Sequence, residues 1–170
     1  TYWVKGYGFS INYEMSCLLF EDLVGATARA AARVAAGQSE LAEPPLRGTF
    51  RFAHAETLLP LIARLGLFHD ENGREMLRAD ADPASPEVAA RHWRAGSIAP
   101  FGANIAVVLW SCPGEGMAVQ ILHNELPVPP PRTLCHKPGM AGDMTLCPLA
   151  DFESTVADLL GCDFHDLCSL

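Results

Sequence analysis

Apolar residues recur every three or four positions over two stretches of the chain, which is the pattern of amphipathic helices. The first stretch predicts a helix over 12–36, and the second predicts a helix over 55–65. Pro60 lies about one turn inside the second helix, so we expect an irregular turn there. A third helix is predicted over 150–160, where Asp151 stands near the start.

Short apolar runs bounded by turn residues predict the strands. The run over 49–53 predicts a short buried strand directly before the second helix. Runs over 103–110 and 117–123 predict a hairpin with a longer loop, because prolines and glycines lie between them. A polar stretch over 69–97 predicts a long excursion with a helical turn near 86–93. Helices interleaved with three or four strands indicate an α/β fold, and so few strands are expected to belong to a larger sheet.

Length and charge narrow the class of protein. The chain has 170 residues with 49% apolar and 19% charged residues, which is the composition of one globular domain. Acidic residues outnumber basic ones by 20 to 12, so a general nucleic-acid binder and a protein that adheres to anionic membranes are both disfavoured. No apolar run approaches the roughly 20 residues of a membrane span. The chain starts at Thr1 without a signal-like segment, so we expect an internal piece of a longer protein or a trimmed product.

Six cysteines, four of them in the last 36 positions, favour an oxidising compartment, although buried free thiols are the alternative. Cys135 and Cys147 bracket a turn-rich loop that a disulfide would close. Cys162, His165 and Cys168 are spaced as part of a zinc site, but the paired Cys-x-x-Cys motifs of a strong match are missing. Disulfides are therefore the better interpretation.

Residues suited to catalysis or ligand binding stand where the predicted strand over 49–53 passes into the following helix. Ligands of open α/β sheets bind beyond the carboxyl ends of strands, and a helix N-terminus there favours an anion such as phosphate. His54 is placed to donate a hydrogen bond to a phosphoryl oxygen, and the carboxylic acid of Glu56 to protonate a leaving oxygen. The alternative is structural: Glu56 stabilises the helix N-terminus and His54 caps the turn.

The stretch over 51–68, Arg-Phe-Ala-His-Ala-Glu-Thr-Leu-Leu-Pro-Leu-Ile-Ala-Arg-Leu-Gly-Leu-Phe, resembles a signature of the multiple inositol polyphosphate phosphatases. These are histidine acid phosphatases of the phytase clan. Most phytases of the clan carry His-Asp at this place, so His-Ala-Glu points to the inositol polyphosphate branch. The resemblance to the family does not cover the part of the polar excursion over 71–90. Further segments resemble the family in the same order along the chain: 6–12, 16–22, 98–104, 107–112 and 119–125.

The resemblance implies hydrolysis of phosphate monoesters through a phosphohistidine. The implied substrates are inositol hexakisphosphate, lower inositol phosphates and 2,3-bisphosphoglycerate, and no metal or organic cofactor is implied. Carried over by position, His54 contacts the phosphate and Glu56 protonates the leaving alcohol. Lys5 is a weaker candidate for substrate binding.

The resemblance also implies an incomplete fold. Residues 1–170 would form the C-terminal portion of a histidine-phosphatase-type α/β sandwich, an incomplete sheet flanked by helices. The family's nucleophile lies in an Arg-His-Gly motif, which is absent here, so the missing N-terminal half of the same domain would supply it. This chain alone is then expected to be inactive, with strand edges and apolar faces left open.

The resemblance also implies a disulfide pairing and a cellular location. A short disulfide loop near the C-terminus is common in the family, and Cys135–Cys147 fits it. A second bridge often runs from the last cysteine to the first half, which would leave Cys168, or else Cys162, unpaired here. The family's route through the secretory pathway implies the endoplasmic reticulum lumen, the cell surface or secretion.

Two alternatives remain beside an inositol polyphosphate phosphatase. The first is a phytase or acid phosphatase of the same clan with another choice of substrate. The second is a phosphate-binding module that kept the fold and lost the half with the nucleophile, which the missing Arg-His-Gly motif suggests.

Overall fold

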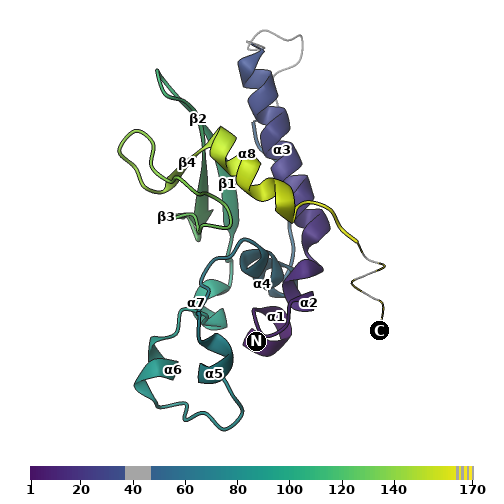
Figure 1. Ribbon diagram of the computed structural model, residues 1–170, viewed down its shortest axis with the longest axis vertical. Coiled ribbons are helices and arrows are strands. Elements are labelled where there is room, and N and C mark those ends of the chain that lie inside the picture. The colour runs from purple at the N-terminus through teal and green to yellow at the C-terminus, as the bar shows by residue number, and fades with distance from the viewer. Residues whose placement is uncertain (37–46, 164, 166, 168, 170) are drawn as a thin grey trace.

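The computed structural model describes residues 1–36, 47–163, 165, 167 and 169. Helices and a small antiparallel sheet alternate along the described chain, which confirms the α/β class (Figure 1). The helices are α1 (Tyr2–Lys5), α2 (Ile11–Glu14), α3 (Cys17–Ala35), α4 (Ala55–Arg64), α5 (Gly73–Met76), α6 (Pro86–Ala90), α7 (Ala95–Ile98) and α8 (Leu149–Val156), with a 3₁₀ turn, Ala157–Leu159. The strands are β1 (Ile105–Cys112), β2 (Gly116–His123), β3 (Leu126–Val128) and β4 (Leu146–Pro148).

Strand β2 is the centre of the four-stranded sheet. It pairs with β1 on one side, and with β3 and β4 on the other, always antiparallel. The register of the predicted hairpin places Val107 opposite Ile121 and Leu109 opposite Val119. Side chains alternate between the two faces of a strand, so these four residues share one face.

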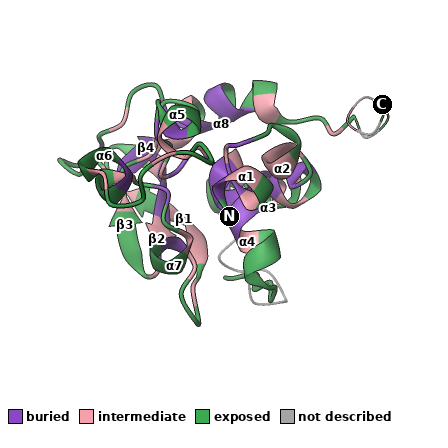
Figure 2. Ribbon diagram, turned by 90° about the horizontal axis from the view of Figure 1, so that it is seen from below, coloured by how far each residue is buried: buried purple, intermediate pink, exposed green. Residues whose placement is uncertain are grey.

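Helices α3 and α8 cover that face (Figure 1). Phe20 of α3 and Phe152 of α8 are buried in the same core as Val119 and Ile121 of β2. The core continues into α4, where Ile62 is fully buried. Buried residues, purple in Figure 2, gather in the middle of the molecule, whereas the segment around α6 is mostly exposed. No described helix has both the length and the apolar composition that crossing a membrane requires.

The outer edge of β1 is open. No other described strand pairs with β1 on that side, although it is eight residues long and carries no charged residue. An unpaired edge of this kind presents a row of free N–H and C=O groups that bind another strand readily. The described sheet is therefore open at this strand, and the open strand edge agrees with the resemblance.

The predicted strand over 49–53 is wrong. The segment is extended but pairs with no described strand, and the side chains of Phe50 and Phe52 are 83% and 96% exposed. A strand needs a neighbour for its backbone hydrogen bonds, and the described residues provide none. The apolar run that suggests burial instead lies on the surface.

The helix predicted over 12–36 is interrupted at Ser16, so that α2 and α3 are separate. The Ser16 hydroxyl donates to the carbonyl oxygen of Tyr13 at 2.7 Å, a side-chain bond that competes with the helix. The same hydroxyl lies 3.4 Å from the carbonyl oxygen of Pro60 on α4. Helix α4 itself runs from Ala55 through Pro60 without interruption, so the irregular turn expected there is not seen.

Two disulfides lie within the part of the chain that the structure describes. Cys135–Cys147 confirms the predicted loop, with Cα atoms 5.9 Å apart. Cys17–Cys162 joins α3 to the segment after α8, with Cα atoms 5.7 Å apart across 145 positions. The family pattern leaves Cys168, or else Cys162, unpaired, and the second of these choices is wrong because Cys162 is bridged. A bridged Cys162 is also not available as a zinc ligand. Cys168 lies outside the described residues.

Removing the long bridge should destabilise the protein more than removing the short one. Loop-closure entropy predicts losses of about 5 kcal/mol for Cys17→Ala/Cys162→Ala and about 3 kcal/mol for Cys135→Ala/Cys147→Ala. Denaturant unfolding of both double variants measures these losses. A larger loss for the short bridge would show that native packing, rather than chain entropy, sets the effect.

The excursion over 69–97 is closed by Asp70, whose carboxylate is buried. One oxygen accepts from the backbone N–H of His92 at 2.8 Å, and the other from the N–H of Trp93 at 2.9 Å. The Nδ1 atom of His92 lies 3.0 Å from the first oxygen. The carboxylate thus joins the two ends of the excursion.

Asp70→Asn should cost about 2 kcal/mol of stability, because an amide NH₂ would face a backbone N–H and leave it unpaired. Thermal unfolding measures the loss. Asp80→Asn is the matched control: its carboxylate pairs with Arg78 on the surface, and its removal should leave the unfolding midpoint nearly unchanged. Equal shifts for the two variants would contradict the role given to Asp70.

Candidate active site

The N-terminus of α4 is open to solvent. His54 precedes the helix with extended backbone and caps it with no side-chain hydrogen bond. The carbonyl oxygen of His54 accepts from the N–H groups of Thr57 and Leu58, at 3.0 and 3.1 Å. No described group accepts from the N–H of Ala55 or Glu56. These two donors and the helix dipole together favour an anion at this end.

The side chains of His54 and Glu56 are both exposed at this helix end. No hydrogen bond or ion pair within the described residues involves either side chain. The structural alternative for His54, a side chain that caps the turn, therefore finds no support here. Glu56 lies in the first turn, where a carboxylate stabilises the helix, so that part of the structural alternative holds beside the functional one.

The segment before His54 is tied to α3 by an ion pair. Nε of Arg51 donates to a carboxylate oxygen of Asp22 at 2.7 Å, and an Nη atom of Arg51 contacts the same oxygen. Arg29, one of two arginines farther along α3, lies 4.0 Å from the other oxygen of Asp22. Sequence reasoning missed this pair, because 29 positions separate Asp22 from Arg51.

Lys5 ends α1, a short helix that contacts α4. Its side chain makes no hydrogen bond or ion pair with His54 or Glu56 in the described part of the chain. Substrate binding by Lys5 therefore stays a prediction.

A broad groove lies at the other end of α4. It is lined by residues from five separate parts of the chain, among them Tyr7, Arg64, His69, His92 and Arg132. None of its lining residues belongs to the first two turns of α4, so the groove is separate from His54 and Glu56. No sequence signal brings these residues together, because each stands in a different local pattern.

Two groove residues are held by partly buried hydrogen bonds. The Tyr7 hydroxyl donates to the carbonyl oxygen of Leu67 at 2.7 Å, and burial raises the pKa of Tyr7, so it remains a donor. An Nη atom of Arg64 donates to the carbonyl oxygen of Leu159 at 2.6 Å. These contacts fasten α4 to its neighbours, which is a structural role.

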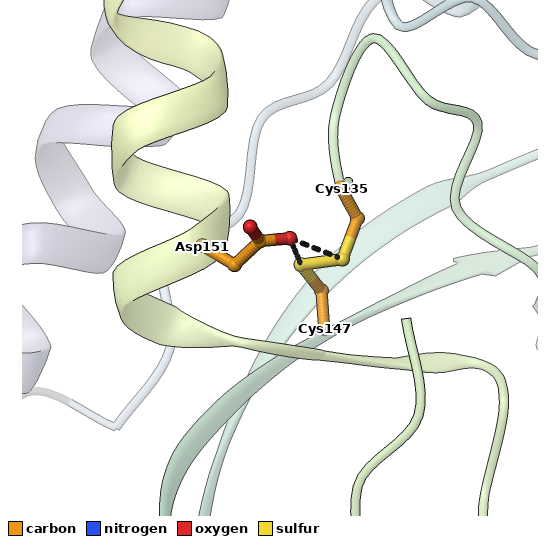
Figure 3. Close-up of side chains that lie close together, drawn as sticks. All are labelled: Cys135, Cys147 and Asp151. Atoms are coloured by element: carbon orange, nitrogen blue, oxygen red, sulfur yellow. Dashed lines mark hydrogen bonds between the residues drawn. A yellow bond between two sulfur atoms is a disulfide. The ribbon is translucent and has the colours of Figure 1, made fainter. Parts of the chain in front are cut away.

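Cys135, Cys147 and Asp151 form the one described group of three metal-type ligands with donor atoms within 4.8 Å of one another. Figure 3 shows the carboxylate of Asp151 beside the joined sulfur atoms, 3.2 and 3.8 Å away. A disulfide sulfur carries no proton and offers no thiolate, so neither sulfur donates a hydrogen bond or binds a metal in this form. The same oxygen accepts the N–H of Lys137 at 2.8 Å, so the cluster braces the start of α8.

Two curated relatives match three quarters or more of this chain. Multiple inositol polyphosphate phosphatase 1 of Gallus gallus is 34% identical over 177 residues, which cover 99% of this chain and 35% of the relative. The human protein of the same name is 35% identical over 133 residues, which cover 75% of this chain and 25% of the relative. The chain thus spans about a third of the length of these relatives or less.

A solved structure shares the fold. The multiple inositol polyphosphate phosphatase of Bifidobacterium longum, crystallised with inositol hexasulfate, matches with a TM-score of 0.62 and 24% identity. The match covers 94% of this chain and 29% of that one. The family model of the histidine phosphatase superfamily (branch 2) matches residues 2–124, which confirms the resemblance seen in the sequence. Because that model spans more than half of the chain, the chain belongs to branch 2 of the histidine phosphatase superfamily.

Proposed function

We propose that this chain supplies the phosphate-contacting histidine and the leaving-group acid of an enzyme that hydrolyses inositol polyphosphates. The observation that carries the proposal is the pair of exposed, unpaired side chains, His54 and Glu56, at the open N-terminus of α4. Both are free to bind a ligand without breaking a contact of the described fold. Family membership gives this pair its chemical meaning.

In the proposed reaction, a nucleophilic histidine from outside these 170 residues attacks the phosphorus atom. His54 and the free N–H groups of Ala55 and Glu56 hold the phosphoryl oxygens, whose charge grows as the bond to the alcohol breaks. Glu56 gives its proton to the leaving alcohol oxygen. Water then attacks the phosphohistidine, the Glu56 carboxylate takes the proton from that water, and phosphate leaves.

Three observations support a division of the enzyme between this chain and a further part. The sequence contains no Arg-His-Gly motif, and the chain spans about a third of the relatives' length. Phe50 and Phe52, directly before His54, are almost fully exposed. The outer edge of β1 lacks a described partner. A further part that covers these groups would also bring the nucleophile to the open end of α4.

The charge of this chain supports the same division. A polyphosphate substrate needs a basic pocket, yet this chain carries a formal net charge of −8. The arginines that bind the substrate would therefore come chiefly from the further part. The substrate class rests on the names of the relatives and on the inositol hexasulfate in the bacterial neighbour. Inositol hexakisphosphate, its lower phosphates and 2,3-bisphosphoglycerate are the candidates.

The two disulfides are consistent with an oxidising compartment. The family then supports the secretory pathway, in the endoplasmic reticulum lumen, at the cell surface or outside the cell. Reduced, unbridged cysteines in the protein taken from its cell would contradict this location.

The role of Glu56 is tested by Glu56→Gln in a chain that also carries the Arg-His-Gly segment. The variant should lose about 10²–10⁴-fold in kcat on inositol hexakisphosphate, because the alkoxide leaves without a proton. On p-nitrophenyl phosphate the loss should be much smaller, since p-nitrophenolate is a stable anion. Steady-state rates on the two substrates measure the difference.

Glu87→Gln is the matched control, because Glu87 is also an exposed acid in the first turn of a helix, α6. It should leave both rates unchanged. Full activity of Glu56→Gln on inositol hexakisphosphate would refute the assigned role. If the natural protein binds inositol hexakisphosphate at micromolar concentration without hydrolysing it, the phosphate-binding module is favoured instead. If the enzyme hydrolyses other phosphate monoesters but not inositol hexakisphosphate, a phosphatase with another substrate is favoured.

A further inference from the structure

We propose that Asp22 and Arg51 act as a positioning pair, which sets the orientation of His54 and Glu56 in the active site. The inference deepens the proposed function and rests on it. Neither residue is expected to touch the substrate. Their role is to hold the backbone of the segment before α4 in one orientation.

The segment over 47–53 has little else to hold it. No backbone hydrogen bond of the described residues involves it, and it pairs with no described strand. The ion pair from Arg51 to Asp22 is the polar contact that ties the segment to the rest of the described chain. The backbone that leads into His54, three residues later, is therefore held by this contact on one side and by the hydrogen bonds of α4 on the other.

Every residue over 47–54 is exposed, but the Arg51 side chain is less exposed than its two aromatic neighbours. Phe50 and Phe52 are 83% and 96% exposed, whereas the Arg51 side chain between them is 28% exposed and turns to α3. His54 follows Arg51 by three residues, and its own side chain makes no hydrogen bond or ion pair with the described residues. Fixing Arg51 on α3 thus fixes the backbone that enters His54 at the start of α4.

The other end of the contact is itself fixed. Asp22 stands in the second turn of α3, close to two anchors of that helix. Cys17 is bridged to Cys162, and the Glu21 carboxylate accepts the N–H of Gly161. These anchors hold α3 against the chain after α8, so Asp22 presents its carboxylate from a rigid support.

A half-exposed ion pair contributes little to global stability. The Asp22 side chain is 49% exposed, so breaking the pair should leave the fold intact. Its effect should appear in catalysis, where small displacements matter: a misplacement of about 1 Å costs up to about 10²-fold in rate. A local effect on rate without a global effect on stability distinguishes positioning from folding.

The test uses the complete, active enzyme and the variants Asp22→Asn and Arg51→Gln. Each should lower kcat on inositol hexakisphosphate by about 10- to 100-fold, with KM changed less than about threefold. The loss should be smaller on p-nitrophenyl phosphate, because a displaced Glu56 matters only where the leaving group needs a proton. The double variant should be no worse than either single one, since the same contact is already broken.

Two further variants serve as controls. Arg29→Gln removes the more distant cation from the same carboxylate, at 4.0 Å, and should leave kcat unchanged. Arg51→Lys keeps a cation opposite Asp22 and should recover most of the rate lost in Arg51→Gln. Thermal unfolding of every variant should match the wild type.

The outcomes separate this inference from the function on which it rests. If Glu56→Gln lowers the rate but Arg51→Gln behaves like Arg29→Gln, the positioning role is wrong and the proposed function stands. If Glu56→Gln itself keeps the full rate, the proposed function fails. Equal losses on both substrates with a lowered unfolding midpoint would show that Asp22 and Arg51 serve folding, which also overturns the positioning role.

Discussion

The burial of strand β2 is the interaction on which the described structure depends. Every other described strand pairs with it, and its Val119 and Ile121 lie under α3 and α8. On the opposite face, Ala118 packs with Met140 and Leu146 of the disulfide loop. Both faces and both edges of β2 are thus covered, so it has the environment of a central strand although the sheet has four strands.

Helix α4 connects this core to the candidate site. Its second half is buried, with Ile62 in the core beside β2, while its first turn is exposed together with His54 and Glu56. One end of the helix is therefore held rigidly, and the other presents free N–H groups and two unpaired side chains. A rigid element with an open N-terminus suits the binding of a phosphate group.

Two parts of the described structure are left open. Phe50 and Phe52 expose large apolar surfaces beside His54, and β1 offers a free edge. Soluble proteins rarely leave such groups uncovered. These groups, and the fact that the chain spans about a third of its relatives, are the basis of the proposal that the catalytic site is assembled from this chain and a further part of the fold.

The sequence by itself determined the elements whose signals are local. The hairpin of β1 and β2, helix α4 and the Cys135–Cys147 loop each follow from a short pattern, and the motif around His54 and Glu56 revealed the family. Tertiary structure decided what depends on distant partners. Ser16 interrupts a continuous apolar pattern, the run over 49–53 finds no strand beside it, and Cys17 meets Cys162 across 145 positions. Periodicity and propensity describe neighbours along the chain, whereas these contacts depend on which surfaces the folded core brings together.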